Sequence, residues 1–144
     1  MLSNTCKYAI RAVLYLAVNS EKGQKIGIKQ ISGDLDIPQP FLGKILQSLA
    51  KHKVLSSTKG PNGGFGLGKN PGDILLIDIV NFIDGMDSFK KCVIGVKYCS
   101  EQENPCALHF RYAKIREEMR NIFEVETIEQ LALDIKEGKQ GFFI

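Results

Sequence analysis

The chain has 144 residues, 44% of them hydrophobic and 24% charged, so it is long enough for one domain with a sizeable core. No apolar run approaches the length of a membrane span and the first residues do not resemble a signal peptide, so we expect a cytoplasmic protein. The net charge of +3 is uneven: residues 1–70 hold ten Lys and Arg against three Asp and Glu, and residues 71–144 hold nine against thirteen. A basic N-terminal half favours a polyphosphate partner, although a solvated basic surface would look the same.

The N-terminal half predicts three helices. Residues 5–18 are apolar on most sides of a helix, which indicates a buried helix, in part covered by another subunit. A second short helix follows at 28–35, and a third runs from Pro38 to His52, with Pro38 at its first position. The third helix has one face of large apolar residues, namely Leu42, Ile45, Leu46 and Leu49. Its opposite face is polar and small, as in a helix that is free to contact a partner.

A hairpin follows the third helix directly. Strands at 54–57 and 65–67 flank a glycine-rich turn, and this order predicts a winged helix-turn-helix. The third helix would enter the major groove of DNA, while the hairpin, or wing, reaches the adjacent backbone or minor groove. Lys51 and Lys53 can neutralise further phosphates. The residues we expect to contact DNA are Gln39, Pro40, Gly43, Lys44, Lys59, Gly60 and Asn62. The alternative is that the two helices and the hairpin only pack the fold together and bind no DNA, because the same arrangement also occurs in proteins without that function.

The glycines of the wing come within one residue of a nucleotide-binding loop. Residues 63–70 nearly match G-x-x-x-x-G-K-[ST], but Asn70 provides no hydroxyl for magnesium. Pro71 and Gly72 follow where the phosphate-capping helix would have to begin. We therefore exclude a nucleotide site and assign these glycines to the hairpin.

The C-terminal half predicts three further helices. The first spans 74–83 and ends near Gly85, and the next begins at Asn104 and Pro105 and runs to about Phe123. A capping box at Thr127 opens a last helix that ends at Ile135. The long helix carries a heptad-like apolar pattern at Leu108, Tyr112, Ile115, Met119 and Ile122. This pattern predicts a dimerisation helix, with packing against the chain's own first helix as the alternative.

Three of the four cysteines lie close together in the sequence. Six residues separate Cys92 from Cys99 and six more separate Cys99 from Cys106, and His109 follows. If the helix begins at Pro105, Cys106 lies in its first turn, where the helix dipole favours a thiolate. Three thiolates and an imidazole suit zinc or an iron-sulfur cluster, and the alternative is a set of unrelated thiols. Cys6 is isolated and His52 ends a helix, so we assign both to structural roles.

These motifs resemble the Rrf family of bacterial winged-helix transcriptional regulators, of the IscR, NsrR and CymR type. The matching segments are Lys7-Tyr8-Ala9, Phe41-Leu42-x-x-Ile45-Leu46, residues 59–65 of the wing and Asp78-Ile79-Val80. The resemblance implies a homodimer that binds a roughly palindromic operator, with a cluster, 2Fe-2S in the IscR type, held by Cys92, Cys99, Cys106 and His109. Both intervals between the cysteines are one residue longer here than in the IscR type.

The sequence therefore predicts a mainly α protein with a small β wing, a winged helix-turn-helix at 1–85, and a cysteine loop, dimerisation helix and tail at 86–144. We expect a DNA-binding repressor or activator controlled by the cluster. The alternative is a winged-helix regulator without a metal, controlled by thiol oxidation, a small ligand or a protein partner. A metal-dependent enzyme is disfavoured, because the sequence offers no paired carboxylates and no Ser/His/Asp order.

Overall fold

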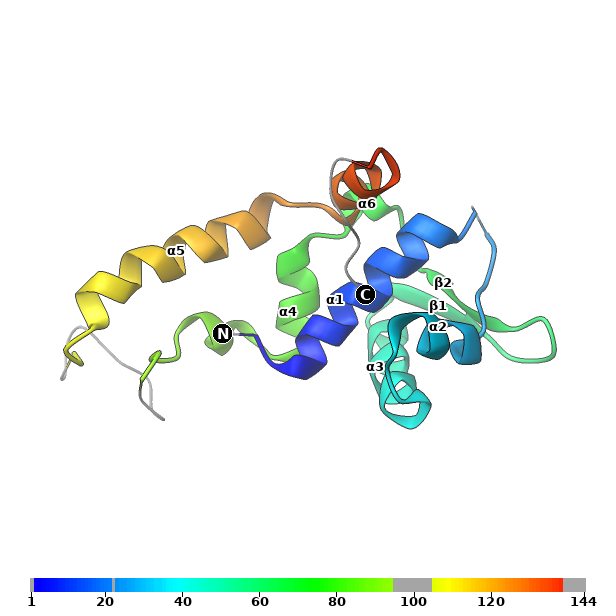
Figure 1. The fold of residues 1–144 in the computed structure, drawn as a ribbon, viewed down its shortest axis with the longest axis horizontal. Helices are drawn as coiled ribbons and strands as arrows, with labels where there is room; N and C mark the ends of the chain where they lie inside the picture. The colour runs from blue at the N-terminus through cyan, green and yellow to red at the C-terminus, as the bar shows by residue number, and fades with distance from the viewer. Residues whose placement is uncertain (1, 22, 95–104, 139–144) are drawn as a thin grey trace.

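A computed structural model describes residues 2–21, 23–94 and 105–138 (Figure 1). A body of short helices and one hairpin carries the long helix α5 (His109–Val125), which extends away from it as an arm (Figure 1). The mainly α fold with a small antiparallel wing is confirmed. In the described parts of the chain no helix is long and apolar enough to cross a bilayer.

The three N-terminal helices form the predicted helix-turn-helix. They are α1 (Asn4–Asn19), α2 (Ile28–Leu35) and α3 (Gln39–Lys51). Ser3 caps α1 by accepting a hydrogen bond from the Cys6 amide at 3.0 Å. Pro38 is the N-cap of α3 rather than its first residue, and Pro40 lies in the first turn, where its missing N–H leaves no intrahelical bond unmade. The buried side of α1 joins the apolar face of α3 in one core.

The end of α3 is a Schellman motif with a lysine in the glycine position. The Lys53 amide bonds the Ala50 carbonyl at 3.0 Å and the Val54 amide bonds the Leu49 carbonyl at 3.1 Å. Lys53 has a φ of 61°, in the left-handed region where a Cβ costs about 1–2 kcal/mol. The chain thus turns sharply from α3 into the wing at the expense of local strain.

We predict that Lys53→Gly raises the free energy of unfolding by about 1 kcal/mol, because glycine adopts the left-handed region without a Cβ clash. Urea unfolding followed by circular dichroism measures the change. Lys53→Ala is the matched control, since it removes the same charge but keeps a Cβ, and should give no such gain. Equal stability of the two variants would contradict the strain at this position.

The wing consists of β1 (Leu55–Thr58) and β2 (Gly64–Leu67), paired from Leu55 with Leu67 to Thr58 with Gly64. Each strand lies within one residue of its predicted bounds. Ile26, just before α2, adds a bridge to Phe65 through two backbone hydrogen bonds of 2.8 and 2.9 Å. A Cβ on Gly64 would lie 2.4 Å from the Ile26 carbonyl oxygen, so glycine is required for this close approach. The bridge attaches the wing to the start of the helix-turn-helix.

The rest of the body begins with a short 3-10 helix, η1 (Pro71–Asp73), before α4 (Leu76–Ile83). The predicted start of α4 at residue 74 was two residues early. Gly85 follows α4 with a φ of 76°, which confirms it as the helix terminator. A second 3-10 helix, η2 (Met86–Phe89), was not predicted, and it buries Phe89.

The prediction that α5 starts at Pro105 was wrong. The helix spans His109–Val125, and the His109 amide bonds the Cys106 carbonyl at 2.9 Å in the turn that precedes it. Proline suits a first helical position, but it is equally suited to the turn that leads into a helix. The last helix, α6 (Ile128–Lys136), packs against α1, and its Thr127 cap is confirmed by a 3.2 Å bond from the Gln130 amide.

Candidate DNA interface and cysteine site

The outer face of α3 has the exposure that a recognition helix needs. Gln39, Pro40 and Lys44 are exposed, whereas the four leucine and isoleucine residues on the opposite face are at most 3% exposed. Gly43 is half-buried, and a Cβ there would lie 3.3 Å from the Cδ1 atom of Ile28 in α2. The small residue at 43 therefore lets α2 and α3 approach closely, in addition to its predicted place at the DNA.

The tip of the wing carries the other predicted DNA contacts. Lys59, Gly60 and Asn62 are all exposed, and the hairpin projects from the body beyond α2 (Figure 1). Gly60 has a φ of 105°, which favours glycine in this turn. Both basic elements are thus presented to solvent on short, well-anchored segments, as phosphate binding requires.

Sequence reasoning missed a group of side chains that brace α3 from α1. The Tyr8 and Phe41 rings meet edge to face with centroids 5.8 Å apart, and Phe41 is 40% exposed. Arg11 places its guanidinium 5.7 Å from the Tyr8 ring and donates from Nη2 to the Leu35 carbonyl at 3.0 Å. That bond satisfies a carbonyl at the C-terminal end of α2. Arg11 therefore ties the turn between the two helices to α1.

The structure of residues 63–70 agrees with the predicted hairpin and not with a nucleotide-binding loop. Its strand pairs antiparallel to β1, and it leads into the 3-10 helix η1 instead of a phosphate-capping helix. The far end of β2 lines a cleft of about 690 Å³, which also touches the end of α1 and Glu129 of α6. Among the residues that the structure describes, none of the predicted DNA or metal residues lines this cleft.

The structure brings together Cys92 and Cys106, which are 14 residues apart in the sequence. Their Sγ atoms lie 3.5 Å apart, and both residues line a pocket of about 10 Å³ with His109, Tyr112 and Arg116. Two thiolates on one tetrahedral metal ion, with bonds of about 2.3 Å, would lie roughly 3.8 Å apart. The observed separation therefore fits a shared metal ion. A disulfide bond, with a length of about 2.05 Å, would form if the two sulfur atoms moved modestly closer together.

The fourth predicted ligand, His109, is 5% exposed and begins α5 at this pocket. Arg116 of the same helix also lines this pocket, so its positive charge would offset the negative charge of bound thiolates. Cys99 lies outside the described residues. Within the described ranges no group of three or more His, Cys, Asp and Glu side chains is arranged to hold a metal ion. A complete metal site therefore needs a ligand beyond those that the structure describes.

Two residues assigned to structural roles have those roles. Cys6 is fully buried among Val80 and Phe89, and burial, together with the nearby Asp84 carboxylate, raises the pKa of its thiol to about 12. The thiol is therefore protonated near neutral pH and is unsuited to binding a metal. His52 is the C-cap of α3, and its ring stacks on that of Phe82 in α4, with centroids 4.3 Å apart and an interplanar angle of 8°.

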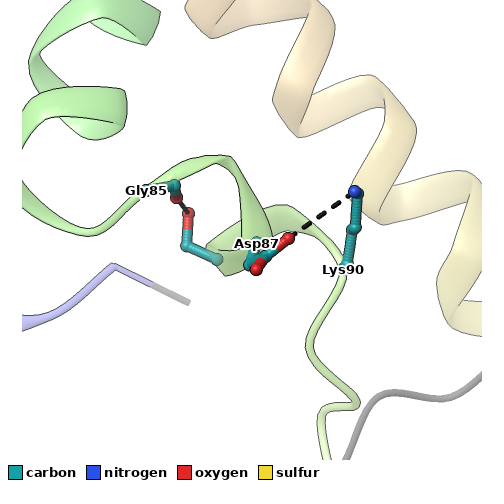
Figure 2. Close-up of polar contacts among 4 residues, drawn as sticks. Gly85, Asp87 and Lys90 are labelled. Carbon is teal, nitrogen blue, oxygen red and sulfur yellow. Dashed lines mark hydrogen bonds and ion pairs between the residues drawn. The ribbon is translucent and has the colours of Figure 1, made fainter.

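A short polar turn connects α4 to Cys92. Ser88 Oγ donates to the Gly85 carbonyl at 3.0 Å, and Lys90 Nζ lies 3.5 Å from Asp87 Oδ1 (Figure 2). Lys90 and Asp87 are both exposed, so their ion pair adds little stability. Burial of Phe89 against the Phe123 ring of α5, with centroids 5.8 Å apart, is the stronger anchor of this segment.

Comparison with known proteins agrees with the winged-helix fold. Residues 2–134 match the Rrf2 family, described as iron-dependent transcriptional regulators. A putative HTH-type transcriptional regulator of Aquifex aeolicus is 34% identical, with 91% of this chain and 90% of that protein aligned. The HTH-type transcriptional regulator IscR of Klebsiella pneumoniae is 28% identical over 90% of this chain and 78% of its own length. The structure of CymR, the global cysteine regulator of B. subtilis, superimposes with a TM-score of 0.72 at 23% identity, covering 92% of this chain and 95% of that one.

Proposed function

This chain belongs to the Rrf2 family and is a DNA-binding transcriptional regulator rather than an enzyme; from that premise we propose a homodimer whose affinity for a roughly palindromic operator depends on an iron-sulfur cluster, of the 2Fe-2S type. The ligands are Cys92, Cys99, Cys106 and His109. When bound, the cluster supplies a redox-sensitive and labile link between these side chains. The observation that carries the proposal is the 3.5 Å separation of the Cys92 and Cys106 sulfur atoms beside the buried His109.

DNA recognition would use the two exposed basic elements. Gln39 and Lys44 have donors suited to base edges in the major groove, and Pro40 and Gly43 keep the backbone of α3 close to the DNA. Lys59, Gly60 and Asn62 of the wing would meet the adjacent phosphates or minor groove. Seven-residue spacing of exposed apolar side chains on α5 supports the dimer, which would place two recognition helices on one duplex.

The DNA part of the proposal predicts a steep dependence of affinity on salt. A duplex selected by the protein from a randomised pool serves as the probe, and fluorescence anisotropy gives its dissociation constant. The affinity should fall linearly on a logarithmic scale as salt rises, because phosphate contacts release counterions. Lys59→Ala should reduce the slope by about one per protomer, whereas Lys136→Ala on α6 should leave it unchanged. Affinity independent of salt would refute these contacts.

The cluster is tested on protein purified without oxygen. Visible absorption bands together with matched iron and acid-labile sulfide would support it, and the band shape separates two-iron from four-iron types. Protein that stays colourless and iron-free after reconstitution with ferrous iron and sulfide would refute it.

The same pair of sulfur atoms favours a second candidate, control by thiol oxidation. A disulfide between Cys92 and Cys106 would need a closer approach of the two sulfurs and no metal. Treatment with diamide, followed by mass measurement after thiol alkylation, would detect it. This candidate would be refuted if both cysteines remained open to alkylation after oxidation.

A further inference from the structure

We propose that His52 and Phe82 are positioning residues, which hold the C-terminal end of the recognition helix against α4 and relay to it the state of the Cys92–Cys106 site. This inference rests on the proposed control of DNA binding through those cysteines. It assigns a role to a ring stack that the predicted DNA contacts do not explain.

The geometry of the pair joins two elements with different tasks. The rings of His52 and Phe82 are nearly parallel and in van der Waals contact, with centroids 4.3 Å apart. His52 is exposed and ends α3, and Phe82 is a partly buried residue of α4 that packs on the main core. A stack at the surface can slide or open without leaving a cavity, whereas the leucine contacts beneath α3 cannot. A shift of α3 relative to α4 would therefore begin at this stack, before the leucine contacts change.

On its other side α4 is tied to the segment that leads to the cysteines. Val80 of α4 is buried with Cys6 and Phe89 in a second small core, which also receives Met119 and Phe123 of α5. Ser3 donates from its backbone amide to the Asp84 carboxylate at 2.8 Å, which fixes the C-terminal end of α4 to the start of α1. Phe89 of η2 lies shortly before Cys92, and Phe123 lies on the helix that begins beside Cys106.

Two ring contacts and the small core between them thus connect the cysteine site to α3. Phe89 and Phe123 join η2 to α5, and Phe82 and His52 join α4 to α3. A change at Cys92 and Cys106 that shifts η2 or α5 would displace α4, and the stacked pair would pass this displacement to the end of α3. The C-terminal end of α3 is also where the chain enters the wing, so both DNA-contacting elements would respond.

The test measures the affinity for the selected duplex in three states of the protein: reduced without metal, reconstituted with ferrous iron and sulfide, and oxidised with diamide. The ratio of affinities between states is the readout. We expect Phe82→Leu and His52→Ala each to reduce the wild-type ratio by about two- to tenfold, the usual contribution of a ring pair. The double variant should lose little more than either single variant, because both remove the same contact.

Two control variants and two measurements separate a relay from simple destabilisation. His52→Tyr keeps an aromatic ring on Phe82 and should retain the ratio, and Asn81→Ala changes an exposed neighbour on α4 and should leave it unchanged. Cluster absorbance and thermal unfolding confirm that each variant is loaded and folded. Variants that weaken binding equally in all states, with the ratio intact, would overturn the relay alone. A wild-type affinity that is the same in all states would overturn the proposed control, and the relay with it.

Discussion

Lysines introduced together at Ile115 and Ile122 are expected to make the protein monomeric and to weaken binding to the selected duplex by about 10²- to 10⁴-fold. These side chains are 59% and 55% exposed, and with Leu108 they form a stripe of seven-residue spacing along α5. Charges on this stripe would have to be desolvated in the proposed dimer. A monomer would contact one half-site only and would lose the gain in affinity that comes from two linked sites.

The substitutions should leave each protomer folded, because the residues through which α5 packs on its own chain are unchanged. Met119 and Phe123, which neighbour the exposed stripe, pack against the buried cluster of Cys6, Val80 and Phe89. Glu117→Lys is the matched control, since it adds a lysine to the exposed opposite side of α5. Sedimentation equilibrium gives the oligomeric state and anisotropy gives the affinity. A double-lysine variant that remains a dimer would show that this stripe is not the interface.

One of the two sequence alternatives for α5, packing against the chain's own first helix, is realised in part, and dimerisation stays a prediction. Met119 packs against the small core that Cys6 of the first helix forms with Val80 and Phe89, while Ile115 and Ile122 of the same heptad pattern face solvent. Periodicity identifies an apolar side, but it does not say how much of that side the protein's own core will cover. Only the tertiary arrangement divides the pattern into a part buried within the chain and a part available to a second copy.

Local signals predicted the N-terminal half well and the cysteine region poorly. Caps, glycines and apolar spacing are local, so they located α1, α2, α3, the wing and the stop at Gly85 within about two residues. The segment after Gly85 has no periodicity, and η2 forms because Phe89 finds a buried place against Phe123. Such long-range burial has no local sequence signal.

The candidate site divides in the same way. The exposure of Lys44 and Lys59 follows from helix and hairpin patterns that are visible in the sequence. Two other contacts depend on how α4 and α5 pack: the approach of Cys92 to Cys106 and the stacking of His52 on Phe82. The spacing of the cysteines in the sequence could suggest their approach, but no sequence spacing could suggest the ring stack. The wrong start of α5 also placed Cys106 in a helical turn, whereas it lies in the turn before the helix.

Serine substitutions at the cysteines are expected to have the largest effect on control. Under the cluster proposal Cys92→Ser and Cys106→Ser each lose most of the bound iron and the visible absorption, because a hydroxyl replaces a soft thiolate ligand. The affinity for the selected duplex then becomes the same with and without reconstitution. Cys6→Ala is the control, because this buried thiol has a pKa of about 12 and lies in a separate core, so iron binding should persist.

Cys99→Ser separates the two modes of control, because only the cluster needs a third thiolate. If the cluster is correct, this variant loses iron as completely as Cys106→Ser does. If a Cys92–Cys106 disulfide is the switch, Cys99→Ser responds to diamide like the wild type, while Cys92→Ser and Cys106→Ser do not respond. If all three variants kept both their iron content and their response to diamide, both modes of control would be contradicted. The sulfur pair 3.5 Å apart would then neither bind the cluster nor form the regulatory disulfide. His109→Ala should lower iron content less than the cysteine variants, because water or another side chain can replace a single imidazole ligand at iron.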